Sequence, residues 1–155
     1  MAWSDQETID AAARSLGAIG EKDFALGAAT TYRVGGPAAI GVKASTEQDL
    51  LRAADVSNIF DLDILVIGRG SNLLISDKGF EGIVVILSEQ FGEIAVNGLE
   101  VTAGAAAPLP VLARKTVNEK LSGLEWMVGV PGTVGGAIRM NAGGHGSDTS
   151  SSLVA

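Results

Sequence analysis

The segment Gly68-Arg69-Gly70-Ser71-Asn72-Leu73-Leu74 is the first place where residue types and spacing could do chemistry. Two glycines one residue apart let successive backbone N–H groups turn inward, which makes a concave site for an anion. The side chains of Ser71 and Asn72 can add hydrogen bonds to a phosphate oxygen. The spacing differs from the dinucleotide fingerprint G-x-G-x-x-G, because Leu73 holds the third glycine position. The segment therefore indicates either a phosphate-binding loop or a tight turn whose Ser and Asn side chains bond their own backbone.

A second glycine-rich segment is Gly129-Val130-Pro131-Gly132-Thr133-Val134-Gly135-Gly136-Ala137. Its four glycines and one proline predict a rigid backbone with few side chains, against which a flat or phosphorylated ligand can lie. The alternative is a sharp chain reversal between a helix and a strand, which does not need so many glycines. We therefore favour a ligand-binding role for this segment.

Three further positions carry polar groups of interest. Arg33 precedes Gly35-Gly36-Pro37 and either steers an anionic group or is a solvated surface arginine. His145 is the only histidine, and it has no neighbouring nucleophile or carboxylate, so we expect a loop residue near the ligand rather than an acid–base catalyst. Glu125 and Trp126 follow a helix end, and we expect core or capping roles for them rather than catalytic ones. No group of His, Asp and Glu has metal-ligand spacing, so no metal site is predicted.

The elements that must position these loops alternate between helices and short apolar runs. A helix is predicted over 4–16, with Ser4 at its start and an apolar face formed by Ile9, Ala12, Ala13 and Leu16. The stretch that follows, up to residue 30, is loop-like. Strands are predicted over 38–42, 64–67 and 83–87, with a helix from about 46 to 56 as the crossover. Their unbroken β-branched runs indicate parallel strands covered on both faces.

The pattern changes after residue 92. Residues 93–96 and 100–103 predict a hairpin with an Asn97-Gly98 turn, and a helix is expected over 108–121. Residues 134–140 are predicted to form a strand. The fold class is therefore α+β, with a lead-in over 1–29 and two small subdomains over 30–88 and 93–155.

Composition excludes several classes of protein. Hydrophobic residues make up 46% and charged residues 19%, which is typical of a globular chain. The net charge is −7 without a block of Lys or Arg, so neither nucleic acid nor an anionic membrane surface is expected as a partner. The absence of Cys excludes disulfides and fits a reducing cytoplasm. No secretory signal or membrane-spanning apolar run is visible.

Several motifs, in order from about residue 23 onward, resemble the UDP-N-acetylenolpyruvoylglucosamine reductase family. They are Thr31-x-Arg33-x-Gly35-Gly36-Pro37-Ala38, the loop at 68–74, Asp77-x-Gly79-Phe80-x-Gly82, Gly123-Leu124-Glu125, the segment at 129–137, and Met140-Asn141-Ala142-Gly143. The pair Gly144-His145 departs from the family, in which Ala-Tyr is common. The resemblance implies an FAD-binding fold of the type shared with vanillyl-alcohol oxidases and p-cresol methylhydroxylase.

The resemblance also implies an activity. NADPH reduces the flavin, and hydride then passes to the enolpyruvyl group of a UDP-sugar, giving UDP-N-acetylmuramate for peptidoglycan synthesis. The loop at 68–74 would hold the pyrophosphate, and the stretches at 129–137 and 140–144 would lie toward the flavin. The cofactor-binding residues implied are Arg33, Gly68, Arg69, Gly70, Ser71, Asn72, Leu73, Gly129, Val130, Pro131, Gly132, Thr133, Gly135, Gly136, Asn141, Ala142 and Gly143.

The family's catalytic arginine, serine and glutamate are expected beyond Ala155, in the rest of the second subdomain and in a substrate domain that this chain lacks. The chain alone is therefore expected to be inactive, and the complete enzyme to be a cytoplasmic monomer. Two alternatives stay open. One is a different FAD-dependent oxidoreductase of the same fold, and the other is a non-catalytic module that binds a flavin or nucleotide.

Overall fold

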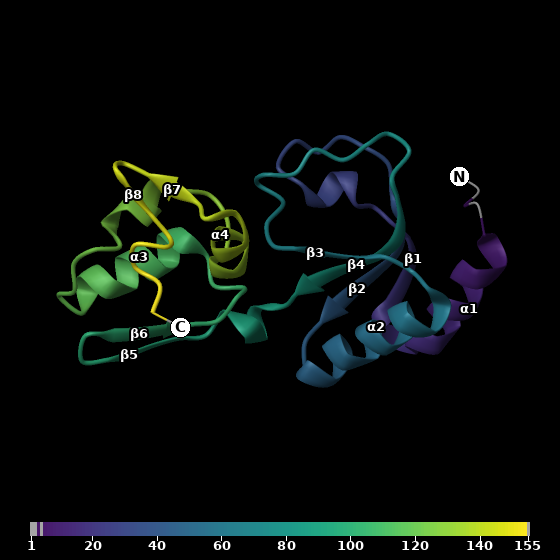
Figure 1. Cartoon of the computed structure of the whole chain (residues 1–155), viewed down its shortest axis with the longest axis horizontal. Helices are drawn as coiled ribbons and strands as arrows, with labels where there is room; N and C mark the ends of the chain where they lie inside the picture. Colours follow the sequence, from purple (N-terminus) through teal and green to yellow (C-terminus); the bar gives the residue numbers. More distant parts are fainter. Residues whose placement is uncertain (1–2, 4, 155) are drawn as a thin grey trace. The chain divides into compact units, whose positions relative to one another are not determined.

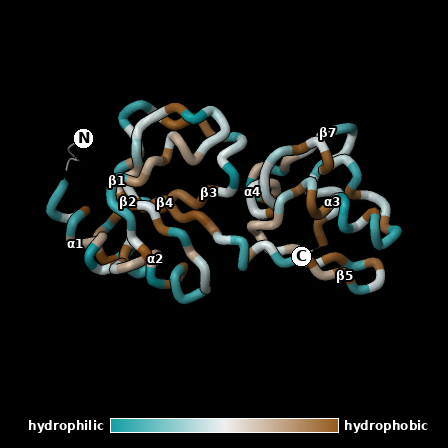
Figure 2. Tube along the Cα trace, turned by 180° about the vertical axis from the view of Figure 1, so that it is seen from behind, coloured by the Kyte–Doolittle hydropathy of each residue, from teal (hydrophilic) through white to brown (hydrophobic). Residues whose placement is uncertain are grey.

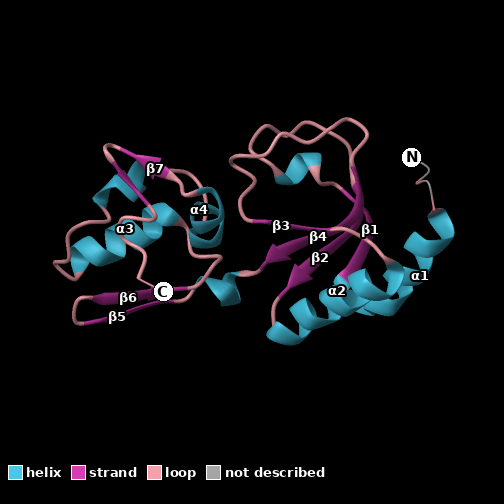
Figure 3. Cartoon of the chain, in the orientation of Figure 1, coloured by secondary structure: helices cyan, strands magenta, loops and turns pink. Residues whose placement is uncertain are grey.

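The computed structural model describes residue 3 and residues 5–154 (Figure 1). The chain divides into two compact units, Met1–Leu87 and Ser88–Ala155. Each is built from helices and strands in mixed order (Figure 3), and each is described by itself below. No helix in the described residues is long and apolar enough to cross a membrane.

Unit 1 is a four-stranded sheet in the order β1-β2-β4-β3. Its elements are α1 (Gln6–Leu16), the 3-10 helix η1 (Gly17–Ile19), β1 (Gly20–Phe24), the 3-10 helix η2 (Gly27–Ala29), β2 (Ala38–Ala44), α2 (Glu47–Phe60), β3 (Ile64–Ile67) and β4 (Phe80–Leu87). Strand β4 pairs in parallel with both β2 and β3, and α2 connects β2 to β3. The predicted parallel strands and crossover helix are confirmed.

Both helices of unit 1 begin where their sequences supply caps. Ser4 lies outside the described residues; the side chain of Asp5 accepts a hydrogen bond from Thr8 N (3.0 Å) and caps α1. The predicted apolar face of α1 is confirmed, since Ile9, Ala12, Ala13 and Leu16 are all buried. Thr46 and Asp49 form a reciprocal capping box at the start of α2.

The prediction that every apolar strand is covered on both faces is wrong for β3. Strands β2 and β4 lie inside the sheet and are buried, but β3 is an edge strand. Helix α2 packs against β2 and β4, so the residues of β3 on the helix side, Ile64 and Val66, are 38% and 61% exposed. Leu65 and Ile67 point to the other face and join a core with Val84. Figure 2 shows the apolar colouring that β3 and β4 share despite this difference.

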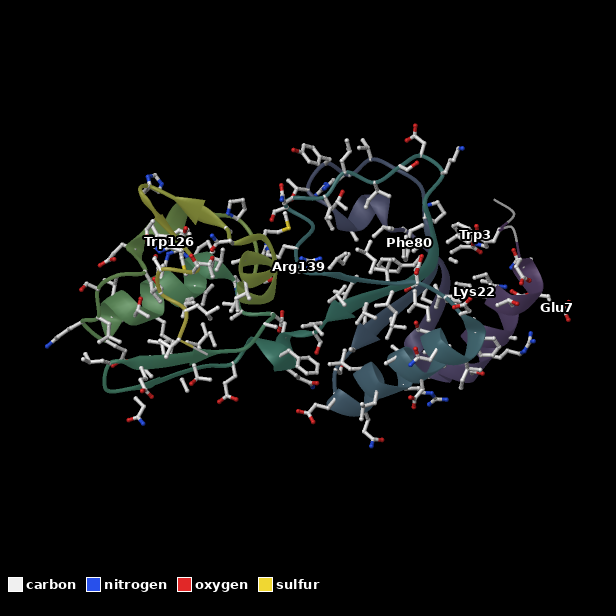
Figure 4. All side chains as sticks on the ribbon, in the orientation of Figure 1. Trp3, Glu7, Lys22, Phe80, Trp126 and Arg139 are labelled. Carbon is white, nitrogen blue, oxygen red and sulfur yellow. The ribbon has the colours of Figure 1, made fainter. Side chains whose placement is uncertain are left out.

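Strand β1 lies in the stretch that the sequence predicts to be a loop. It pairs antiparallel with β2 at the other edge of the sheet, and Phe24 is its buried residue. Its Glu-Lys-Asp segment faces solvent, so it lacks the apolar pattern of a strand. Lys22 of this strand forms an ion pair with Asp10 of α1 (Figure 4).

Unit 2 combines one hairpin with short helices around a small core. Its elements are the 3-10 helix η3 (Glu89–Gly92), β5 (Ile94–Asn97), β6 (Glu100–Ala103), α3 (Leu109–Asn118), the 3-10 helix η4 (Glu125–Gly129), α4 (Val134–Met140), β7 (Gly143–Gly144) and β8 (Ser147–Asp148). The core includes Ile94, Leu109, Leu112, Trp126 and Met127. Trp126 lies among the packed side chains of this unit (Figure 4), as its predicted core role requires.

The predicted hairpin is confirmed, with its turn shifted by one residue. Asn97 pairs with Glu100, so the two-residue loop is Gly98-Leu99 rather than Asn97-Gly98. Gly98 supplies the positive φ of 62° that the turn needs.

Helix α3 ends earlier than predicted, at Asn118. Lys120 takes the left-handed conformation (φ 61°), and Leu121 N donates to Thr116 O (2.9 Å), which closes the helix three residues before Gly123.

The prediction of a strand over 134–140 is wrong, because these residues form helix α4. Thr133 acts as the N-cap, and its hydroxyl accepts from Gly136 N (3.5 Å). Asn141 ends the helix in the left-handed conformation. The apolar residues Val134 and Ile138 are spaced for a helix as well as for a strand, and a seven-residue segment is too short for periodicity to separate the two.

Candidate functional site

Two loops of unit 1, over 25–37 and 68–79, lie side by side on the face of the sheet opposite α1 and α2 (Figure 3). Backbone hydrogen bonds join them: Thr31 N donates to Gly70 O (3.1 Å), and Gly36 N donates to Ser76 O (2.8 Å). The sequence motifs at 31–38, 68–74 and 77–82 thus belong to one local structure. Arg33 is thereby placed on the loop adjoining Gly70.

Glycine at position 70 is required by the packing of these two loops. Gly70 has a φ of 61°, and a Cβ there would lie 2.7 Å from Thr30 Cα. Gly36 makes a similar approach, since its Cβ would lie 2.5 Å from Asp77 O. The space beside Gly70 is therefore filled by the chain's own backbone.

The loop at 68–73 nevertheless offers free donors for an anion. Within the part of the chain that the structure describes, the backbone N–H groups of Arg69, Asn72 and Leu73 donate to no carbonyl or side chain. Arg69 and Asn72 are exposed, whereas the side chain of Leu73 packs against the core beneath the loop. Unpaired N–H groups on an anchored, glycine-bent loop are donors from which phosphate oxygens can accept hydrogen bonds.

Arg33 lies on a bend held by Thr30. The buried hydroxyl of Thr30 donates to Gly27 O (2.9 Å), and Arg33 N donates to Thr30 O (3.3 Å). Arg33 itself is exposed and left-handed, with a φ of 55°. An arginine in this conformation carries backbone strain that the neighbouring loop must hold in place.

The glycine-rich segment at 129–137 differs from the loop at 68–73, because its backbone N–H groups at the start of α4 donate to carbonyl groups of the chain itself. Val134 N donates to Ala107 O and Gly135 N donates to Ala105 O, both at 2.9 Å. The start of α4 is thus closed by protein and offers no open anion site. Gly136 is exposed, and the nearest atom to a Cβ there is Thr133 Oγ1 at 3.6 Å, so this side of α4 is open.

The stretch Asn141-Ala142-Gly143 leads from α4 into the β7–β8 hairpin. Both ends of the Asn141 amide are used within the chain: Nδ2 donates to Asp148 Oδ2 (3.3 Å), and Oδ1 accepts from Ser150 N (2.8 Å). Ala142 O accepts from Thr149 N (2.9 Å) and from Thr149 Oγ1 (2.8 Å). This stretch can therefore offer a ligand its backbone and shape, while the Asn141 side chain is engaged.

Sequence reasoning missed Asp148, which organises this turn. Its carboxylate accepts from Ser150 Oγ and from the backbone N–H of Ser151, and these bonds, the Ser150 bond first, lower the pKa of Asp148 below its usual value. Asp148 stands outside every motif of the sequence, so no residue pattern singles it out.

His145 and Glu125 take minor roles. His145 is exposed at the tip of the hairpin with a φ of 53°, and its Nε2 lies 3.4 Å from where a Cβ on Gly129 would be. The Glu125 carboxylate accepts from Gly123 N (2.7 Å) in the loop before η4, and the start of η4 has no side-chain cap. Its pKa is lowered by its own backbone N–H and by that of Gly123. No three His, Asp or Glu side chains within the described residues are grouped as a metal site.

The pattern of the family described as "FAD binding domain" matches residues 38–155, so the chain belongs to this family of FAD-binding proteins. Its sequence is similar to UDP-N-acetylenolpyruvoylglucosamine reductases. It is 44% identical over 136 residues to that of Caulobacter sp. strain K31, covering 85% of this chain and 43% of the relative. It is 43% identical over 125 residues to that of Bacillus subtilis strain 168, covering 81% and 41%.

Solved structures agree with the sequence comparison. The crystal structure of UDP-N-acetylenolpyruvylglucosamine reductase (MurB) from Thermus caldophilus matches with a TM-score of 0.67 and 35% identity, over 83% of this chain and 44% of that one. p-Cresol methylhydroxylase matches with a TM-score of 0.53 and 12% identity, over 75% of this chain and 26% of that one, which shows the shared fold alone. The predicted α+β fold of the p-cresol methylhydroxylase type, the resemblance to the reductase family and FAD as cofactor are confirmed.

The chain spans about two fifths of the length of these curated relatives.

Proposed function

We propose that this chain is the FAD-binding portion of a UDP-N-acetylenolpyruvoylglucosamine reductase. The observation that carries the proposal is the anchored loop at 68–73 with its unpaired N–H groups, in a chain of the FAD-binding domain family. The residues present fit the cofactor, because FAD contains a pyrophosphate and such donors bind phosphate oxygens.

In this proposal the backbone N–H groups of Arg69, Asn72 and Leu73 donate to the pyrophosphate. The guanidinium groups of Arg33 and Arg69 offset its negative charge, and the charge on the phosphate oxygens strengthens each N–H bond that they accept. Gly68, Gly70 and Ser71 shape the same loop. Gly70 does so indirectly, by letting the loop pack against Thr30.

The second unit supplies shape rather than phosphate donors. Gly129, Val130, Pro131, Gly132, Thr133, Gly135, Gly136, Asn141, Ala142 and Gly143 are proposed to line the flavin side of the cofactor. The exposed backbone at Gly136 suits a flat ring, because no side chain stands in the way. Asn141 and Gly135 act by holding the backbone, since their polar groups bond within the chain.

For the whole enzyme we propose NADPH as reductant and the enolpyruvyl UDP-sugar as substrate, in peptidoglycan synthesis. Bound FAD would relay hydride from the one to the other. Subdomains at 30–88 and 93–155 would bind the cofactor, and the catalytic residues would lie in a part of the enzyme other than this chain. We propose that the complete enzyme is a cytoplasmic monomer.

Equilibrium titration of the purified chain with FAD and with riboflavin tests this proposal, read by flavin fluorescence. Bonds from N–H groups to a charged oxygen contribute about 1.5–3 kcal/mol each, so FAD should bind at least about ten-fold more tightly than riboflavin. Equal affinities would contradict a pyrophosphate role for the loop. Oxidation of NADPH by this chain in response to the UDP-sugar would contradict the proposed division between binding and catalysis.

A further inference from the structure

The chain after α4 closes on itself around Asp148. The Asp148 carboxylate accepts from Ser150 Oγ (2.9 Å) and Ser151 N (3.0 Å) through Oδ1, and from Asn141 Nδ2 (3.3 Å) through Oδ2. The Asn141 amide oxygen accepts from Ser150 N (2.8 Å). Asn141 and Asp148 therefore hold each other and the turn at Ser150 in one ring of hydrogen bonds.

This ring fixes the backbone that it encloses. Thr149, which is 6% exposed, donates to Ala142 O from both its N–H and its hydroxyl. Gly143 and Gly144 pair with Asp148 and Ser147 in the β7–β8 hairpin. The positions of Ala142 and Gly143 thus depend on a segment that follows them in the sequence.

The hairpin in turn packs on the glycine-rich segment. A Cβ on Gly144 would lie 3.3 Å from Val130 Cγ2, and a Cβ on Gly129 would lie 3.4 Å from His145 Nε2. These distances show how little space separates the hairpin from residues 129–130, and β7 packs against η4, so a shift of the hairpin would move the backbone there. The ring around Asp148 therefore reaches both stretches of unit 2 that the proposed function assigns to the cofactor.

We propose that Asp148 is a positioning residue for FAD, which holds Ala142-Gly143 and Gly129-Val130 in place through Asn141 and the β7–β8 hairpin. The inference rests on the proposed function. The contact on which this positioning depends is the hydrogen bond that the amide nitrogen of Asn141 donates to a carboxylate oxygen of Asp148.

Exchanging the side chains at positions 141 and 148, singly and together, tests whether this pairing of a donor with an acceptor is needed. In Asp148→Asn the new amide nitrogen faces Asn141 Nδ2, donor against donor, while Oδ1 still accepts from Ser150 and Ser151. In Asn141→Asp two carboxylates face each other. The double variant Asn141→Asp/Asp148→Asn restores a donor facing an acceptor and keeps the bond from Ser150 N. Aspartate also tolerates the left-handed backbone at position 141.

The measurement is the dissociation constant of FAD for each variant, with visible circular dichroism of the bound flavin as a second readout of its geometry. Because each single variant loses the hydrogen bond that holds the hairpin backbone, it should bind FAD about five-fold more weakly, with an altered dichroic spectrum. The double variant should recover both readouts to within about two-fold of the parent. As a matched control, Asp55→Asn removes an exposed carboxylate of α2 in unit 1 and should leave affinity unchanged.

Parent-like affinity in either single variant would overturn the inference and leave the proposed function standing. The same would follow if the double variant bound as weakly as the singles while its unfolding transition matched that of the parent. A parent chain that bound no FAD would overturn the proposed function and this inference together.

Discussion

Gly135 and Gly136 are neighbours in α4 with different surroundings, so alanine at each separates packing from ligand binding. A Cβ on Gly135 would lie 3.0 Å from Ala105 Cβ and 3.2 Å from Ala105 O. At Gly136 the nearest atom would be Thr133 Oγ1, at 3.6 Å, which is ordinary contact. Both residues are helical, and alanine restricts the backbone of the unfolded chain more than glycine does. Each substitution alone therefore adds about 0.5–1 kcal/mol to the free energy of unfolding.

Gly136→Ala should therefore raise the free energy of unfolding by about 0.5–1 kcal/mol. The same methyl group should weaken FAD binding about ten-fold, because crowding a packed contact costs about 1–3 kcal/mol and 1.4 kcal/mol is a factor of ten. Gly135→Ala should be less stable than Gly136→Ala by about 1 kcal/mol, since its methyl group presses on Ala105.

Urea unfolding followed by tryptophan fluorescence, to which Trp126 of unit 2 contributes, gives the stabilities, and FAD titration gives the affinities. Parent-like FAD affinity in Gly136→Ala would refute the assignment of the open side of α4 to the cofactor. Equal stability of the two alanine variants would refute the packing argument at Gly135.

Three further predictions concern stability. Lys120→Gly should stabilise the chain by about 1 kcal/mol in urea unfolding without changing FAD affinity, because Lys120 holds a left-handed φ that glycine adopts freely; an unchanged midpoint would contradict this. The pKa of Asp49 is lowered by the backbone N–H groups of Ser45 and Thr46, so its stabilising effect is full above its ordinary pKa of 3.8 and is lost as pH falls through the lower folded value. Asp49→Asn should flatten the acid limb of a stability–pH curve, and an unaltered limb would count against this capping role. Amide hydrogen exchange should be faster in β5 and β6, a two-stranded sheet, than in the buried strands β2 and β4, and equal protection would contradict this difference.

Local patterns in the sequence predict most of unit 1, because its helices carry caps and its inner strands are continuous apolar runs. Strand β1 escapes prediction because its Glu-Lys-Asp segment is polar and because a long loop over 25–37, rather than a short hairpin turn, joins it to its partner strand β2. The exposure of β3 escapes prediction for a related reason. Its composition equals that of a buried strand, and only its place at the sheet edge decides what covers it.

Details of the candidate site also depend on contacts between distant segments, which local sequence patterns do not predict. Glycine spacing predicts the loop at 68–74, but the structure shows that Gly70 is set by packing against Thr30, a contact between segments far apart in the sequence. The strand predicted over 134–140 is helix α4, because the cap at Thr133 and the bonds from Val134 and Gly135 to distant carbonyls outweigh a short apolar run. The engagement of Asn141 by Asp148 depends on a turn whose geometry no spacing rule describes.

The central claim is that the free N–H groups of Arg69, Asn72 and Leu73 bind the pyrophosphate of FAD. Amide-resolved hydrogen exchange by NMR, on the chain alone, with FAD and with riboflavin, tests it most directly. Exchange at these three amides should slow when FAD binds and should not slow with riboflavin, which has no phosphate. Tight binding of FAD with exchange at all three amides unchanged would contradict the account.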